Sequence, residues 1–305
     1  MTLSSRHYPV LVTGARGLLG RALAPLLAAS APRPDAVRLT DLHDLDVTDG
    51  RAVSKVMREV APRTVFHLAA WTDVDGAEAH PEEARRLNAE AAATVARAAA
   101  RSGALVVHMS TDFIFDGTKA GAYVEDDPPS PLGVYARTKA ESETAVRDAA
   151  PAGHLVVRTA WLYGAGGRNF VDAILSAAKA GRPLRVVTDQ VGCPTWSEDL
   201  ARALLALVEA DARGTFHACG GGEASRWDLA RASLDATGLA GMPIERIATA
   251  DLPRPARRPA RAVLSTEKLL RTLGFRLPPW RESLAAYIAA RKGSGTFFGD
   301  PRKSQ

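Results

Sequence analysis

The segment "GVYARTKAE" (133–141) places a tyrosine and a lysine four positions apart, Tyr135 and Lys139. Side chains four residues apart share one face of a helix. A tyrosine can give a proton to a carbonyl oxygen, but its free pKa of about 10 makes it a weak acid at neutral pH. A nearby lysine ammonium would stabilise the phenolate and lower that pKa. The pair is a candidate proton donor, although ordinary helices carry the same spacing.

A glycine-rich motif, "TGARGLLG" (13–20), stands between an apolar run and an amphipathic stretch. Glycines let the chain turn tightly, let a pyrophosphate approach the backbone, and let a helix pack close to a strand. The helix N-terminus adds unpaired N–H groups and positive dipole. The spacing differs from the usual G-x-G-x-x-G. The motif predicts a dinucleotide site formed by Gly14, Arg16, Gly17, Leu18, Leu19 and Gly20.

Two residues bear on which nicotinamide cofactor would bind. Asp41 follows the motif at the distance where an acidic residue holds the adenosine ribose of NAD, although it also reads as a turn or cap aspartate. Arg16 could meet the 2′-phosphate of NADP instead. We expect use of both NADPH and NADH, with a mild preference for NADPH. Further cofactor contacts are expected at Asp46, Val47, Leu68, Ala69 and Ala70.

The motifs require a scaffold of alternating strands and helices. Strands are predicted at 8–14, 36–42, 64–70, 104–115 and 154–164, and helices at 18–30, 49–61, 81–103 and 135–150. This alternation predicts a Rossmann-type α/β fold, a doubly wound parallel sheet covered on both faces. Residues 1–165 would form the nucleotide-binding domain. Residues 166–292 would form a smaller C-terminal α/β substrate-binding lobe, with some elements returning to the sheet, and 293–305 a disordered tail.

Composition limits the classes of function. The 305 residues are 46% hydrophobic and 24% charged, as in ordinary globular proteins. No apolar run approaches the roughly 20 residues of a membrane helix, and the start lacks a signal-peptide layout. Only two cysteines occur, Cys193 and Cys219, which favours a cytoplasmic protein. The net charge is +5, and the densest basic cluster (254–262) is short and broken by proline. This argues against nucleic-acid binding and suits a phosphorylated small molecule.

Several motifs together identify a resemblance. The glycine loop, "FHLAA" (66–70), "STDFIFDG" (110–117) and "YARTK" (135–139) resemble the extended short-chain dehydrogenases/reductases. Within that superfamily the chain most resembles the dTDP-4-dehydrorhamnose reductase family, nearly from end to end. Its most specific segments are "VVRTAWLYG" (156–164), "DQVGCPT" (189–195) and "RRPARAVLSTEKL" (257–269).

The resemblance implies an activity and roles for residues. The family reduces the 4-keto group of a dTDP-4-keto-6-deoxyhexose with NAD(P)H. Tyr135 would give the proton, Lys139 would also reach the nicotinamide ribose, and Thr111 would orient the carbonyl. Asn88 would support the lysine through water, or would be a surface amide. His67, where the family more often has asparagine, reads as structural.

The substrate would meet a second group of residues. The family places Trp161 against the sugar, and Arg257 and Arg258 could clamp the diphosphate, since arginine suits bidentate phosphate contacts. The substrate contacts expected are Thr111, Asp112, Phe113, Trp161, Arg257 and Arg258. Some relatives use Mg2+ at a dimer contact, but no acidic cluster here demands it. No metal ligand is predicted, and a homodimer is left open.

Two other functions compete. A nucleotide-sugar dehydratase or epimerase shares the superfamily, but dehydratases usually have Asp-Glu after the threonine, and here Asp112 and Phe113 follow Thr111. The non-catalytic β subunit of methionine adenosyltransferase also shares the fold, binds a partner enzyme and retains NADP. Intact Thr111, Tyr135 and Lys139 favour catalysis without excluding that reading. The sugar and the C4 stereochemistry stay open.

Overall fold

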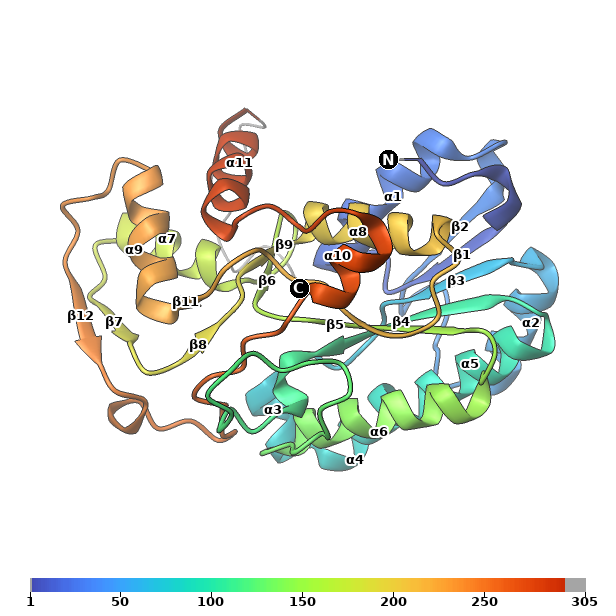
Figure 1. The fold of residues 1–305 in the computed structure, drawn as a ribbon, viewed down its shortest axis with the longest axis horizontal. Coiled ribbons are helices and arrows are strands. Elements are labelled where there is room, and N and C mark those ends of the chain that lie inside the picture. The colour runs from blue at the N-terminus through green and yellow to red at the C-terminus, as the bar shows by residue number, and fades with distance from the viewer. Residues whose placement is uncertain (1, 294–305) are drawn as a thin grey trace.

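The computed structural model describes residues 2–293 and is built on a six-stranded parallel sheet (Figure 1). The strand order is β10-β5-β4-β3-β1-β2, and the register pairs Val10 with both Val37 and Thr64. This order confirms the predicted doubly wound topology. The strands are β1 (Val10–Thr13), β2 (Val37–Thr40), β3 (Thr64–His67), β4 (Leu105–Thr111), β5 (His154–Thr159) and β10 (Gly214–His217).

Helices cover both faces of the sheet, which is why β1 and β3 are buried throughout. On one face α1 (Leu18–Ser30) packs against α8 (Ser197–Glu209). On the other face lie α2 (Gly50–Val60), α5 (Ala91–Arg101) and α6 (Val134–Ala149) (Figure 1). The two halves of the core therefore lie on either side of the same sheet.

The long helix predicted at 81–103 is interrupted. It consists of α4 (Pro81–Arg85), a π-helical segment (Arg86–Glu90) and α5. Asn88 lies within the π-helical segment, and such segments are frequent at functional sites. A short helix before it, α3 (Val74–Ala79), was not predicted from the sequence.

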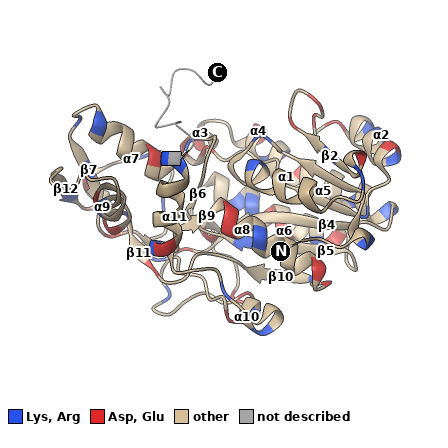
Figure 2. Cartoon of the chain, turned by 90° about the horizontal axis from the view of Figure 1, so that it is seen from above, with Lys and Arg blue, Asp and Glu red and all other residues tan. Residues whose placement is uncertain are grey.

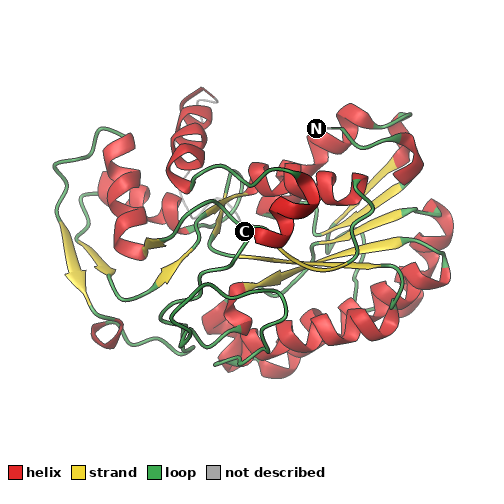
Figure 3. Ribbon diagram, in the orientation of Figure 1, coloured by secondary structure: helices red, strands yellow, loops and turns green. Residues whose placement is uncertain are grey.

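The C-terminal half forms a second cluster of helices beside short strand pairs (Figure 3). Its strand pairs are β6 (Leu162–Tyr163) with β9 (Thr195–Trp196), β7 (Leu184–Val187) with β12 (Ile244–Ile247), and β8 (Val191–Gly192) with β11 (Ala224–Ser225). Its helices are α7 (Phe170–Lys179), α9 (Arg226–Ala236) and α11 (Trp280–Gly293).

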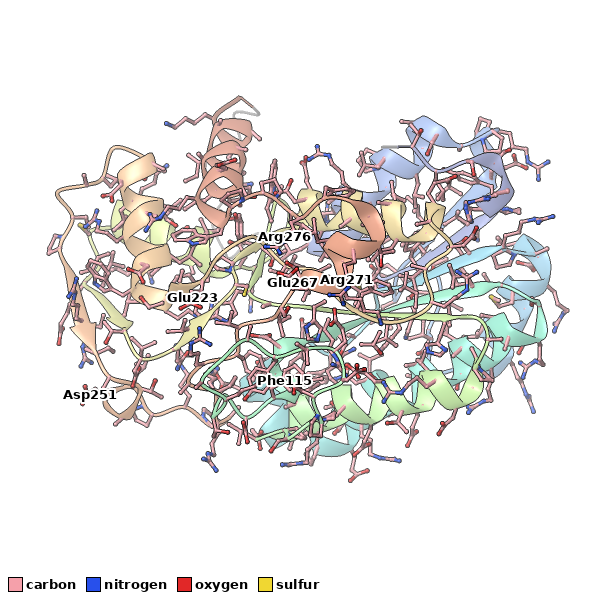
Figure 4. All side chains as sticks on the ribbon, viewed as in Figure 1. Phe115, Glu223, Asp251, Glu267, Arg271 and Arg276 are labelled. Atoms are coloured by element: carbon pink, nitrogen blue, oxygen red, sulfur yellow. The ribbon has the colours of Figure 1, made fainter. Side chains whose placement is uncertain are left out.

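Besides α8, two further elements after residue 166 pack on the central sheet. β10 pairs with β5, and α10 (Glu267–Leu273) lies against β10. Glu267, Arg271 and Arg276 lie together there, and Arg276 forms an ion pair with Glu267 (Figure 4). The division of the chain at residue 165 stays a prediction. The predicted tail lies outside the described residues, apart from Gly293, which ends α11.

Charged residues of both signs are spread over both halves of the described chain (Figure 2). None of the helices within residues 2–293 has the length and apolar character needed to cross a membrane.

Candidate active site

A cavity of about 850 Å³ opens at the carboxyl ends of the central strands. It extends past the loops after β1 and β3, the two neighbours between which the strand order reverses. Ligands of open α/β sheets bind at such switch points. The wall includes residues from both halves of the chain, from Gly14 to Arg258.

The glycine loop forms one end of the cavity. Gly14 has a φ of 69°, and a Cβ there would lie 2.6 Å from the backbone nitrogen of Ala69. A Cβ at Gly20 would lie 2.5 Å from the carbonyl oxygen of Ala15. α1 begins just after Gly17, so its first-turn N–H groups have no intrahelical acceptors. This cradle fits a pyrophosphate. The wall includes the predicted Gly14, Arg16, Gly17, Leu18, Leu19, Gly20, Leu68, Ala69 and Ala70.

The acidic residue expected to select the cofactor lies beside the loop. Asp41, just past β2, accepts a hydrogen bond from the backbone nitrogen of Arg16 at 2.9 Å. The guanidinium of Arg16 lies 3.8 Å from the carboxylate of Asp44. Asp41 and Val47 both line the cavity, whereas Asp46 does not. The Asp46 carboxylate instead accepts hydrogen bonds from the backbone and hydroxyl of Thr48.

The proposed proton donor, Tyr135, lies on α6 opposite Thr111 at the end of β4. Burial raises the pKa of Tyr135 to about 12, although a hydrogen bond with Thr111 acts to lower it. The expectation that Lys139 lowers this pKa is not met in this structure. The physical reason is that desolvation dominates, and the Lys139 ammonium donates to the carbonyl oxygen of Met109 at 2.7 Å.

Lys139 itself is buried, with only 3% of its surface exposed. Burial lowers its pKa to about 8, and Glu143 acts in the opposite direction. Beneath it lie two stacked imidazoles, those of His67 and His108, with ring centroids 5.5 Å apart. Burial, and then the charge of Lys139, lowers the pKa of His67 to about 3, so that this ring is neutral at working pH.

Asn88 does not line the cavity. Its side-chain oxygen accepts from the backbone nitrogen of Trp71 at 2.8 Å, and its nitrogen donates to the Thr138 hydroxyl at 2.9 Å. Asn88 therefore ties the π-helical segment to α6, one residue before Lys139.

The predicted substrate residues next to Thr111 line the cavity. The Thr111 hydroxyl donates to Asp112 at 3.0 Å, and burial raises the pKa of Asp112 to about 7. Phe113 packs edge-on against Tyr135, with ring centroids 5.8 Å apart. Trp161 also lies on the wall and has a φ of 45°, in the left-handed region that only glycine adopts easily.

The two arginines predicted to bind the substrate diphosphate, Arg257 and Arg258, differ in position. Arg258 lies on the cavity wall, and its guanidinium donates to both carboxylate oxygens of Asp75, at 2.9 and 2.8 Å. That contact lowers the pKa of Asp75. Arg257 is exposed and lies outside the cavity lining. The structure thus brings one of the pair to the site.

Sequence reasoning missed several lining residues. Arg226 begins α9 and lies over the ring of Trp161, with 3.6 Å between its guanidinium carbon and the ring centroid. No local sequence signal marks this contact, because the two residues are 65 positions apart. The other missed lining residues include Thr72, Val74, Leu87, Ser110, Arg168 and Phe170. Among residues 2–293 no cluster of three His, Cys, Asp or Glu side chains could hold a metal ion.

The fold and cavity define a Rossmann-type reductase of the extended short-chain dehydrogenase/reductase class. The family model of the RmlD substrate binding domain matches residues 8–292, and the chain belongs to this family. A dTDP-4-dehydrorhamnose reductase from Sinorhizobium fredii is 40% identical over 290 residues, covering 92% of this chain and 96% of the relative. A dTDP-4-keto-6-deoxy-D-glucose reductase from Streptomyces niveus is 40% identical over 247 residues, covering 79% and 85%.

Solved structures agree with this membership. A dTDP-4-dehydrorhamnose reductase from Clostridium acetobutylicum superimposes with a TM-score of 0.86 at 37% identity, covering 93% of this chain and 99% of that one. The enzyme of the same name from Bacillus anthracis, solved in complex with NADP, gives a TM-score of 0.88 at 30% identity, covering 95% and 100%.

Proposed function

We propose that the protein reduces the 4-keto group of a dTDP-4-keto-6-deoxyhexose with NAD(P)H. The observation that carries the proposal is that Thr111, Tyr135 and Lys139 face the same cavity as the Gly14–Gly20 loop. A ketone reduction needs a hydride donor and a proton donor side by side, and a dinucleotide with its pyrophosphate on the glycine loop could extend its nicotinamide to Tyr135 within this one cavity. The family membership supports the same reaction.

The residues have separable tasks in this reaction. A nicotinamide held in this cavity would supply the hydride. The Thr111 hydroxyl, which donates to Asp112 in the structure, would turn its one proton to the substrate carbonyl and orient it. Tyr135 would give its phenolic proton to the carbonyl oxygen as charge develops there. The buried Lys139 ammonium faces the same cavity and would bind the nicotinamide ribose.

The cofactor would lie with its pyrophosphate on the glycine loop and its adenosine beside Asp41 and Val47. Asp41 and Arg16 both line this end of the cavity, where Asp41 could hold the ribose and the Arg16 guanidinium could meet a 2′-phosphate. We therefore propose use of both cofactors, with a mild preference for NADPH. We propose a cytoplasmic enzyme whose two cysteines are free, with Mg2+ dependence and a homodimer as the properties to test first.

The test is incubation with NADPH and a panel of dTDP-4-keto-6-deoxysugars, with the product followed by NMR. Loss of the 4-keto signal with formation of a new C4–H is the expected result, and its stereochemistry identifies the epimer. Tight NADP binding without reduction of any panel member would overturn the proposal in favour of a regulatory subunit.

A further inference from the structure

Arg226 is held in place by its backbone surroundings. It follows Ser225, whose hydroxyl caps α9 by accepting from the backbone nitrogen of Asp228 at 3.0 Å. Its own backbone nitrogen donates to the carbonyl oxygen of Gln190 at 3.2 Å. The start of the helix is therefore fixed against the 189–195 loop, and the side chain points into the cavity.

The guanidinium covers one face of the Trp161 ring, at 3.6 Å from its centroid, and lies 5.2 Å from that of Phe170. Trp161 has little freedom to move away. A Cβ at Gly192 would lie 2.6 Å from its indole ring, and its backbone keeps the φ of 45°. The Trp161 ring, which is expected to lie against the sugar, is thus covered on one face by the Arg226 guanidinium, a cation that lines the cavity.

The Arg226 guanidinium has N–H donors that no acceptor in the described residues uses. Within residues 2–293 no other residue forms a hydrogen bond or ion pair with it, whereas Arg258 is engaged by Asp75. A guanidinium has five N–H donors, and a partly buried one without acceptors is costly. Burial lowers the pKa of Arg226 to about 10, so it remains charged at neutral pH.

The charges that face Arg226 favour an anionic ligand. Asp112 is the nearby carboxyl, but burial raises its pKa to about 7, so it is only partly ionised at neutral pH. Arg258 acts on Arg226 as a like charge from the same part of the cavity. An oxyanion placed between the two arginines would relieve that repulsion and accept the free donors.

We infer that Arg226 is the specificity-determining residue that binds the diphosphate of the nucleotide-sugar substrate, in place of the predicted Arg257. This inference rests on the proposed function for the identity of the substrate. Its chemistry, recognition of a diphosphate, can be measured without turnover.

The experiment measures the affinity of dTDP and of thymidine by calorimetry for three variants. Arg226→Met keeps an unbranched stem against Trp161 and removes the charge, Arg226→Lys keeps the charge and removes the planar fork, and Arg257→Ala is the matched exposed control. We expect Arg226→Met to raise the Kd of dTDP at least ~10-fold and Arg226→Lys to raise it less. Thymidine and NADPH affinities should stay within about twofold, and Arg257→Ala should match the wild type.

A steady-state measurement adds a second readout. KM for the ketosugar should rise with the dTDP Kd while kcat changes less, as for lost uniform binding. A dTDP Kd within twofold of wild type in Arg226→Met, or an equal loss of thymidine affinity, would overturn the inference. If Arg226→Met does not fold, a folded Arg226→Lys variant with unchanged affinity for dTDP would overturn the inference instead. Wild-type binding of dTDP without reduction of any ketosugar would contradict the proposed function alone.

Discussion

The Lys139 ammonium lies 3.5 Å from the Nε2 nitrogen of His108, a buried imidazole that also contacts the Ser142 hydroxyl at 2.8 Å. The tautomer of His108 decides between these two contacts: Nε2 either accepts from the Lys139 ammonium or donates to the Ser142 hydroxyl, which gives its own proton to the Lys139 carbonyl oxygen at 2.7 Å. The ionisable groups around Lys139 are His108 on β4, His67 on β3 and Glu143 on α6. Burial, and then Lys139, lowers the pKa of His108 well below its ordinary value, so His108 is a neutral ring that can accept at only one of its two nitrogens.

The first prediction follows from this contact. Lys139 is charged below its pKa of about 8 and neutral above it, so kcat/KM should fall as pH rises through about 8. Where Nε2 accepts from the ammonium, His108→Leu removes that acceptor and should move this alkaline limb to lower pH by about half a unit, the scale of one weak hydrogen bond. His108→Gln, with an acceptor near the Nε2 position, should retain the wild-type limb. If kcat/KM falls at the same alkaline pH in all three proteins, His108 acts only through packing.

The second prediction concerns the proton donor. Tyr135→Phe removes the phenolic proton and should lower kcat by at least ~10²-fold, the usual contribution of acid catalysis. The ring remains, so its edge-on packing with Phe113 and the affinity for NADPH should be kept. Single-turnover rates and NADPH titration measure the two effects. Near-normal turnover in this variant would exclude the assigned role of Tyr135.

The third prediction concerns cofactor choice. Arg16→Ala removes the cation that could meet a 2′-phosphate but keeps the backbone N–H that donates to Asp41. We expect kcat/KM for NADPH to fall several-fold more than that for NADH, because only NADPH carries the extra anion. Asp41→Ala is the matched comparison, and it should lower kcat/KM for NADH more than that for NADPH. Equal losses for both cofactors in Arg16→Ala would show that Arg16 does not read the 2′-phosphate.

Elements with a strong local pattern were predictable from the sequence. The helix predicted at 18–30 is α1 residue for residue, and that predicted at 135–150 is α6 shifted by one residue at each end. β7 and β12 were missed, because each is a strand of only four residues whose partner lies about 60 positions away. Such pairing depends on tertiary contacts, which leave little periodicity in the local sequence.

The site was predictable where its residues are neighbours in sequence. The glycine loop and the Tyr135–Lys139 pair each act through local spacing, and both reach the cavity. Arg257 and Arg258 are adjacent and chemically alike, yet only Arg258 meets Asp75 and the cavity. Which of two adjacent arginines faces a distant carboxylate is decided by the tertiary fold.

The last prediction concerns the buried ion pair that supports the catalytic helix. Arg158 on β5 donates to both oxygens of Glu143 on α6, at 2.8 and 2.7 Å, and the two side chains are 3% and 0% exposed. Glu143→Gln leaves the Arg158 charge buried without its partner, which costs about 3–5 kcal/mol in the free energy of unfolding. Arg147 contacts the same carboxylate at 3.2 Å but is 36% exposed, so Arg147→Ala should cost less than about 1 kcal/mol.

The pH dependence of this effect tests its electrostatic origin. Burial acts to raise the pKa of Glu143, but Arg158 outweighs it and holds that pKa below the ordinary value. A carboxyl whose pKa is lowered by folding adds stability above its unfolded pKa of about 4.3, and that stability is lost as pH falls through the folded pKa. Urea denaturation of wild type and Glu143→Gln should therefore give a large difference near pH 7 that shrinks in acid. A small difference at pH 7, or one independent of pH, would show that packing around Glu143, and not its charge, holds α6 to the sheet.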